Sequence, residues 1–95
     1  MPAEQSLARP DVYVVVRLLD VLHASPQRLR RTQLQQRAGI NYTLFARYLD
    51  FLVQRGFVAV GAENDGGWVE ITARGEEAYR FLADGLARLL GGHPP

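Results

Sequence analysis

Cysteine is absent from this sequence, and histidine is nearly so, occurring only as His23 and His93. Without cysteine there can be no disulfide bond and no thiolate metal site. The two isolated histidines form no ligand cluster, so we expect neither a metal nor a cofactor. A glycine-rich phosphate loop is also missing, as is any grouping of histidine with carboxylates. These absences argue against an enzyme.

Long apolar runs are missing as well. No stretch approaches the roughly 20 residues that a membrane span requires. The first ten residues, MPAEQSLARP, have neither the positive start nor the apolar centre of a secretory signal. We therefore expect a soluble cytoplasmic protein with no membrane partner. A chain of 95 residues predicts one domain, which we place at 10–90, with an N-terminal arm at 1–9 and a tail at 91–95.

Positive charge is placed unevenly along the chain. The formal net charge is only +1, and all eleven basic residues are arginines. Six of them lie within residues 28–55 beside a single acidic residue, Asp50, whereas acidic residues outnumber arginines in both flanking parts. A local basic segment is typical of nucleic-acid binding. The alternative interpretation is an arginine-rich surface that only keeps the protein soluble.

The first half of the chain predicts two helices with a short strand between them. Residues 11–24 are apolar nearly all round at helical spacing, which implies burial on more than one side. Residues 28–30 then predict a short strand. Thr32 and Gln35 have the spacing of a capping box, which opens a second helix that ends near Ala38.

A glycine turn then leads into the third helix. Gly39 can adopt the left-handed conformation that ends a helix, and Asn41 is a favourable N-cap for the next one. The following residues predict a helix from Tyr42 to Arg55, which Gly56 ends. Helix, glycine turn and helix form the outline of a helix-turn-helix, whose second helix can enter the major groove of DNA.

The second half of the chain predicts a β-hairpin and a final helix. Strands at 57–60 and 68–71 flank a segment dense in turn residues, 61–67. Thr72 is the N-cap of a helix at about 73–90. The complete order of elements is that of a winged helix-turn-helix, an α+β fold that is mainly α, with an additional C-terminal helix.

Four residues of the third helix are candidates for reading DNA bases: Asn41, Tyr42, Thr43 and Arg47. The first three begin the helix, where helix-turn-helix proteins reach base edges. Arg47 lies one turn after Thr43, and arginine to guanine is the commonest specific contact. The alternative roles are a plain helix cap for Asn41, partial burial for Tyr42, and an intrahelical ion pair with Asp50 for Arg47.

Four further arginines are better suited to the DNA backbone, where contacts position the protein without reading sequence. They are Arg28, Arg30, Arg31 and Arg37.

The last helix carries an apolar stripe. Its members are spaced by three, four and three residues; they are Tyr79, Leu82, Leu86 and Leu89. One small core can hardly absorb both this stripe and the apolar first helix, so we expect a homodimer joined through the last helix. The alternative is that the stripe packs on the first helix of its own subunit.

Two stretches of the chain, TQLQQRAGINYTLFARYLDFLVQRGFV and WVEITARGEEAYRFL, resemble the small archaeal winged-helix DNA-binding proteins. The resemblance covers roughly Leu29 to Leu90. It implies a DNA-binding regulator or chromatin-type protein that forms a homodimer through its terminal helices. The helix after Asn41 would be the recognition helix, and the hairpin turn would be the wing. The wing here departs from the usual basic pattern, because it carries Glu63 and Asp65.

The function expected from these observations is binding of double-stranded DNA, either sequence-specific or chromatin-type, and most simply as a transcriptional regulator. The alternative is a winged-helix adaptor that binds proteins and no DNA. The acidic wing and the small net charge favour the adaptor, whereas the arginines in and before the third helix favour DNA. No small-molecule effector is evident from the sequence.

Overall fold

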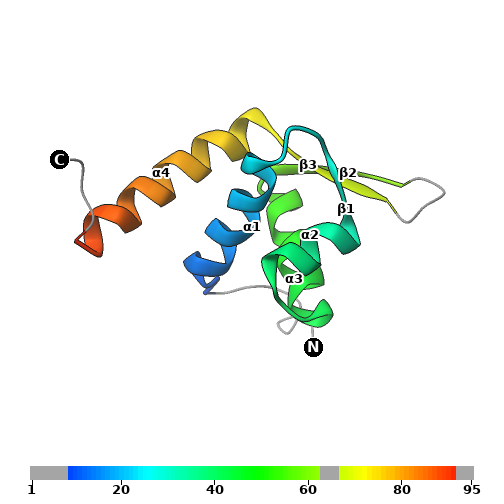
Figure 1. The fold of residues 1–95 in the computed structure, drawn as a ribbon, viewed down its shortest axis with the longest axis horizontal. Coiled ribbons are helices and arrows are strands. Elements are labelled where there is room, and N and C mark those ends of the chain that lie inside the picture. The colour runs from blue at the N-terminus through cyan, green and yellow to red at the C-terminus, as the bar shows by residue number, and fades with distance from the viewer. Residues whose placement is uncertain (1–8, 63–66, 92–95) are drawn as a thin grey trace.

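The computed structural model describes residues 9–62 and 67–91. Its elements confirm the predicted winged helix with an additional C-terminal helix (Figure 1). They are α1 (Val12–Ala24), β1 (Leu29–Arg30), α2 (Arg31–Ala38), α3 (Tyr42–Gln54), β2 (Val58–Gly61), β3 (Trp68–Ile71) and α4 (Ala73–Leu89). The acidic wing residues Glu63 and Asp65 lie outside the described residues.

The three strands form an antiparallel sheet in the order β1-β3-β2. The central strand pairs on both sides at Val69, which faces Leu29 of β1 and Val60 of β2. Val69 is fully buried. The β2–β3 hairpin and the far end of α4 project from opposite sides of the molecule (Figure 1).

The core is formed by the inner faces of α1, α2 and α3 together with the sheet. Its completely buried side chains are Leu18, Leu19, Leu34, Leu52 and Val69. Helical spacing predicts five apolar side chains on the inner face of α3: Phe45, Tyr48, Leu49, Leu52 and Val53. The first four are buried, whereas Val53 is 37% exposed. Among the described residues, no buried polar side-chain atom lacks a hydrogen bond, as a well-packed core requires.

The start of α2 differs from the prediction. The helix begins at Arg31 rather than after a Thr32 cap, and Arg30 stands at the N-cap. Arg30 is also the last residue of β1, where it pairs with Trp68, so the strand passes directly into the helix. One arm of a capping box is still present, because the backbone N–H of Arg30 donates to Oε1 of Gln33 at 2.9 Å.

The start of α4 is fixed against β2. Thr72 is the N-cap, as predicted, and its hydroxyl oxygen accepts from the N–H of Gly75 at 3.0 Å. A Cβ atom on Gly75 would lie only 2.0 Å from the carbonyl oxygen of Phe57. Only glycine therefore permits this close approach of α4 to the residue that precedes β2.

Four side chains then hold the first half of α4 against α1. His23 lies 2.7 Å from Glu76 and stacks on the ring of Tyr79, with 4.6 Å between ring centroids. The Tyr79 hydroxyl donates to Asp20 at 2.5 Å. This hydrogen bond, with smaller contributions from burial and neighbouring carboxylates, raises the pKa of Tyr79 above its usual value. The contacts set the direction in which α4 leaves the domain.

None of the helices in residues 9–62 and 67–91 combines the length and apolar character that crossing a membrane requires.

Candidate nucleic-acid interface

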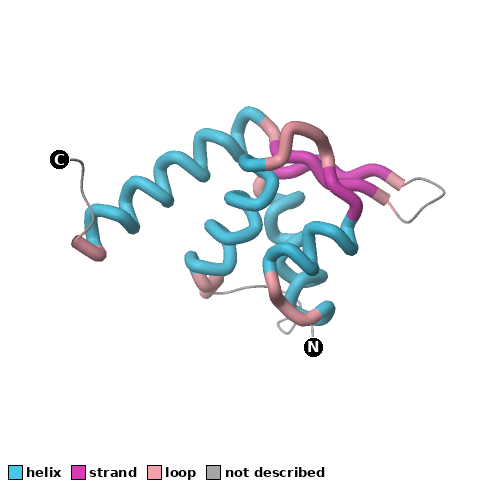
Figure 2. The backbone as a smooth tube through the Cα atoms, viewed as in Figure 1, coloured by secondary structure: helices cyan, strands magenta, loops and turns pink. Residues whose placement is uncertain are grey.

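The turn between α2 and α3 has the geometry that its glycine predicts (Figure 2). Gly39 is left-handed, with φ 72°, and its N–H donates to the carbonyl of Gln35 at 3.0 Å. The turn is also held from outside, because Nη1 of Arg17 on α1 donates to the carbonyl of Ala38 at 3.1 Å. The side-chain amide of Gln35 donates to the carbonyl of Ile40. These bonds fix the angle between the two helices.

Sequence reasoning did not find the role of Arg17. The helical wheel places it on the polar side of α1, where it reads as an ordinary solvated arginine. The only local signal is its position on an otherwise apolar helix. Its acceptor, the free carbonyl at the end of α2, lies 21 residues further along the chain.

Asn41 is the N-cap of α3, as predicted. Its Oδ1 accepts from the N–H of Leu44 at 2.8 Å. Reading adenine with both amide atoms requires a free oxygen acceptor as well as the amine. While Asn41 caps the helix, it is therefore best placed to donate from its amine alone.

The outer side of the first half of α3 is open to solvent. Tyr42 is 67% exposed, and Thr43 and Arg47 are exposed one helical turn apart on the same face. Within the described residues, Arg47 forms no ion pair with Asp50, whose carboxylate instead accepts from Gln54 at 3.0 Å. The Arg47 guanidinium is thus available to a partner outside the chain.

The four predicted phosphate-contacting arginines lie just before β1, in β1 and in α2. Arg28 stacks on the Trp68 ring, with its guanidinium carbon 4.3 Å from the ring centroid. Arg31 reaches the base of the hairpin, where its Nε would lie 3.5 Å from a Cβ on Gly67. Arg37 is exposed in the last turn of α2.

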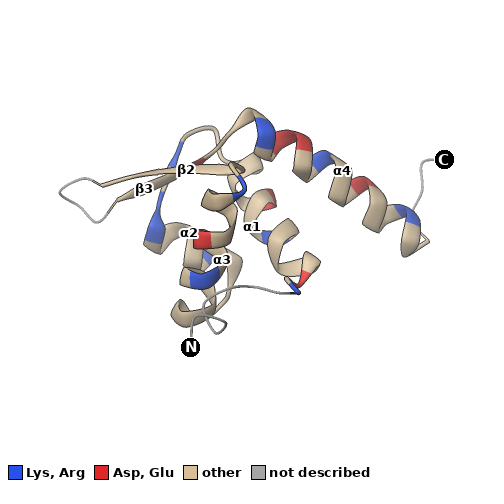
Figure 3. Ribbon diagram, turned by 180° about the vertical axis from the view of Figure 1, so that it is seen from behind, with Lys and Arg blue, Asp and Glu red and all other residues tan. Residues whose placement is uncertain are grey.

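Figure 3 shows arginine positions at β1 and the start of α2 beside the base of the hairpin, and both arginine and acidic positions on α3, whereas α4 carries both signs of charge in alternation. Arg31 lines a surface hollow together with Tyr42 and Asp50 of α3, so this arginine adjoins the exposed face of α3.

The predicted dimer stripe is divided between two environments. Tyr79 and Leu82 are partly buried and pack against the core of their own chain. Further along α4, Leu86 is half-buried and Leu89 is 82% exposed. The C-cap residue Leu90 is 68% exposed, and Phe81, which the apolar stripe did not include, is 78% exposed.

In the part of the chain that the structure describes, no three histidine, aspartate or glutamate side chains gather closely enough to hold an ion.

Comparison with known proteins agrees with this architecture. The sequence profile of the winged helix-turn-helix family matches residues 9–85. The chain belongs to the winged helix-turn-helix family. The match covers α1 through most of α4, so it includes the candidate interface and much of the helix that projects from this winged-helix domain.

Several solved structures are similar to the winged-helix chain. Sso10a-2 from Sulfolobus solfataricus, a DNA-binding protein, is 27% identical over 81% of both chains, with a TM-score of 0.71. A MarR-family transcriptional regulator from Silicibacter pomeroyi is 24% identical over 86% of this chain and 59% of its own, with a TM-score of 0.68. A winged-helix DNA-binding protein from STIV is 16% identical over 99% of this chain and 98% of its own, with a TM-score of 0.69.

The last two likenesses show the fold alone. A comparison with curated protein sequences finds no match.

Proposed function

We propose that this winged-helix protein binds double-stranded DNA through α3 and acts as a transcriptional regulator without catalytic activity. The observation that carries the proposal is the exposed first half of α3. Arg47 on this face has no internal carboxylate partner among the described residues. An exposed arginine on the second helix of a helix-turn-helix is suited to the major groove. The similarity to Sso10a-2 adds support.

Each arginine group has a distinct role in this proposal. Arg47 reads a base edge, with Tyr42 and Thr43 beside it. Asn41 caps the helix and donates from its amine. Arg28, Arg30, Arg31 and Arg37 contact phosphates along the groove. Arg31 lines the same surface hollow as Tyr42 of α3, which supports this role for it.

Fluorescence anisotropy with a labelled random duplex, measured from about 50 to 200 mM salt, tests the proposal. Four phosphate contacts per subunit predict that the logarithm of the affinity falls linearly with the logarithm of salt, with a slope of about −3 to −4 per subunit. The absence of binding at low salt and micromolar protein would favour the adaptor that binds no DNA.

A matched control distinguishes the loss of an arginine at this interface from the loss of an arginine elsewhere on the protein. Arg88 lies on α4 and pairs with Asp84 at 3.1 Å, far from α3 in the chain. Arg31→Gln is expected to reduce the salt slope by about one unit. Arg88→Gln removes the same formal charge and is expected to leave the slope unchanged.

We further infer that the protein is a homodimer joined through the second half of α4. This half projects beyond α1 (Figure 1) and exposes Leu89, which is followed by the exposed C-cap residue Leu90. Phe81 is exposed as well, but at 3.6 residues per turn it lies on the opposite side of the helix from Leu90 and is not part of this contact. Apolar side chains grouped on a projecting helix are typical of a subunit interface. Leu86 lies one turn before Leu89 and Leu90 and completes the contact. Tyr79 and Leu82 reach the partner only at the edge, because they pack on their own α1.

A further inference from the structure

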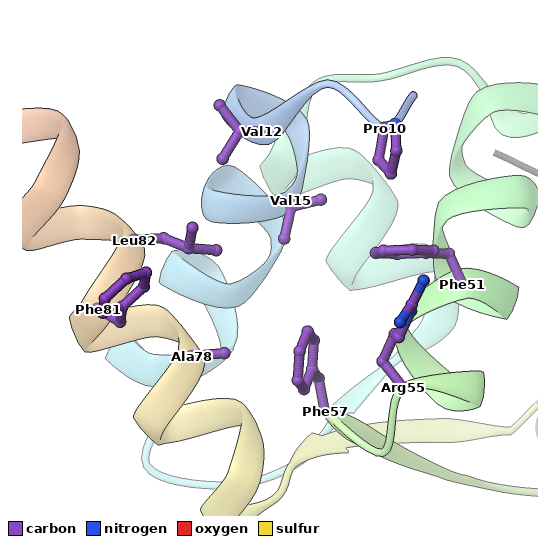
Figure 4. Close-up of a pocket in the computed structure, with 9 residues that line it drawn as sticks. All are labelled: Pro10, Val12, Val15, Phe51, Arg55, Phe57, Ala78, Phe81 and Leu82. Atoms are coloured by element: carbon purple, nitrogen blue, oxygen red, sulfur yellow. The ribbon is translucent and has the colours of Figure 1, made fainter. Parts of the chain in front are cut away.

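The open side of α3 extends from Thr43 past Arg47 to Asp50. At 3.6 residues per turn, these three residues lie within about 60° of one another around the helix, and all three are exposed. Another side of α3 faces its own chain, because Phe51 lines an apolar cleft together with residues of α1 and α4 (Figure 4). A duplex that lies along the open side therefore meets Asp50 as well as Arg47.

The charge of Asp50 is unlike that of its surroundings. It is the only acidic residue in the segment 28–55, which contains six arginines. On a surface that binds DNA, a carboxylate repels the phosphates and lowers the affinity. That loss is offset only where a base edge donates a hydrogen bond to the carboxylate.

The side chains next to Asp50 on this side of α3 are small. Ala46 lies one turn before it and Val53 one turn after it, and both are exposed. An aspartate is much shorter than an arginine, so it contacts a base edge only where the helix backbone comes close to the groove floor. Small neighbours on both sides permit that close approach.

The carboxylate of Asp50 is also held in place. Nε2 of Gln54 donates to its Oδ2 at 3.0 Å. Arg31 and Tyr42 line the same surface hollow, which has a volume of about 270 Å³. Within residues 9–62 and 67–91, neither Arg31 nor Arg47 forms an ion pair with Asp50. Because a carboxylate has about four acceptor positions, it can accept from a partner outside the chain.

We propose that Asp50 accepts a hydrogen bond from the N4 amine of a cytosine and is a specificity-determining residue of α3. In the major groove, cytosine N4 and adenine N6 are the donors. Adenine presents N6 next to the acceptor N7, which disfavours a carboxylate, whereas cytosine presents no acceptor of its own there. This inference rests on the proposed DNA binding through α3 and adds a preferred base to it.

Arg47 and Asp50 together define a short recognition element. They are about 4.5 Å apart along the helix axis, compared with about 3.4 Å between successive base pairs. The guanine read by Arg47 and the cytosine read by Asp50 should therefore lie in neighbouring base pairs or in pairs separated by one. Any other base at the second position leaves the carboxylate without a donor, so the contact discriminates at a cost in overall affinity.

The test selects preferred duplexes from a random library with the full chain and then changes one base pair at a time. Replacing the C·G pair should weaken wild-type binding by about 5- to 150-fold. Asp50→Asn keeps the acceptor for Gln54 but removes the charge, and it should reduce this factor to below about two-fold. The loss at the guanine read by Arg47 should remain. Random DNA should bind the variant about two- to five-fold more tightly, because a like charge is removed.

Glu77→Gln is the matched control. Glu77 is an exposed carboxylate in the first half of α4, where no residue is assigned to DNA. Its neutralisation should change neither the base preference nor the affinity for random DNA. Circular dichroism of both variants should match the wild type, since both positions are exposed.

Three results would overturn the role of Asp50 while leaving DNA binding intact. They are a wild type that binds duplexes with no preference for C·G at any position, a preference that survives Asp50→Asn, and equal effects of Asp50→Asn and Glu77→Gln. A wild type that binds no duplex at low salt would overturn the proposed function as well. The two failures are therefore distinguished by the wild type alone.

Discussion

Replacing Arg47 with alanine tests the assignment of α3 as the DNA-reading helix. Arg47 is exposed and has no ion pair among the described residues, so its removal should change the free energy of unfolding by no more than about 0.5 kcal/mol. Any larger loss of DNA affinity is then a property of the interface. A base-reading arginine contributes about 1–3 kcal/mol of discrimination, which corresponds to roughly a 5- to 150-fold loss in affinity.

The assay compares two duplexes at one salt concentration. One is the preferred sequence selected from a random library, and the other is random DNA. Arg47→Ala should weaken the preferred duplex by the larger factor and random DNA much less. Arg31→Ala should weaken both about equally, because phosphate contacts carry no sequence information. Equal losses on both duplexes for Arg47→Ala would refute its base-reading role.

Three further predictions concern stability and assembly. Gly75→Ala should lower the melting temperature, because its Cβ would clash with a backbone carbonyl at 2.0 Å, whereas a Cβ at Gly85 meets nothing within 4 Å. Gly85→Ala should therefore stabilise α4 by about 0.5–1 kcal/mol, and the reverse order of melting temperatures would contradict this packing. Combining Leu86→Glu with Leu89→Glu should give a folded monomer by sedimentation velocity and circular dichroism; loss of helicity would place these leucines in the core instead. Tyr79→Phe should lower the melting temperature at neutral pH. Since the folded-state pKa of Tyr79 is raised, its contribution is complete below about pH 10 and is lost at higher pH, so a deficit that persists unchanged in strong alkali would contradict the role of this hydroxyl.

The helix-turn-helix was predictable because its signals are local. Gly39 and Asn41 act on atoms within a few residues of themselves, through a left-handed turn and a side-chain cap. The inner face of α3 also follows from helical spacing alone. The exception is Val53, which is 37% exposed.

Features that depend on distant parts of the chain were not predictable. The prediction of Thr32 as N-cap was wrong because Arg30 pairs with Trp68 in the sheet, so the strand determines where α2 begins. The apolar stripe of α4 has a regular spacing, yet spacing cannot say which half meets α1. The structure divides it at Leu82, because α1 covers only the first half of α4.

In the candidate site too, features with local causes were predictable and features that depend on other side chains were not. The exposure of Arg47 follows from its place on the helical wheel, but the freedom of its guanidinium does not. Asp50 lies within pairing distance in sequence, and only the structure shows it accepting from Gln54 instead.

Mapping amide chemical shifts during titration with duplex DNA tests the central claim most directly. The account predicts that the perturbed residues include 41–47 together with Arg28, Arg30, Arg31 and Arg37, with those of the second half of α4 unchanged. The same titration with Arg47→Ala should reduce the shifts of α3 on the preferred duplex. Perturbations confined to α4, or none at low salt, would contradict DNA binding through α3.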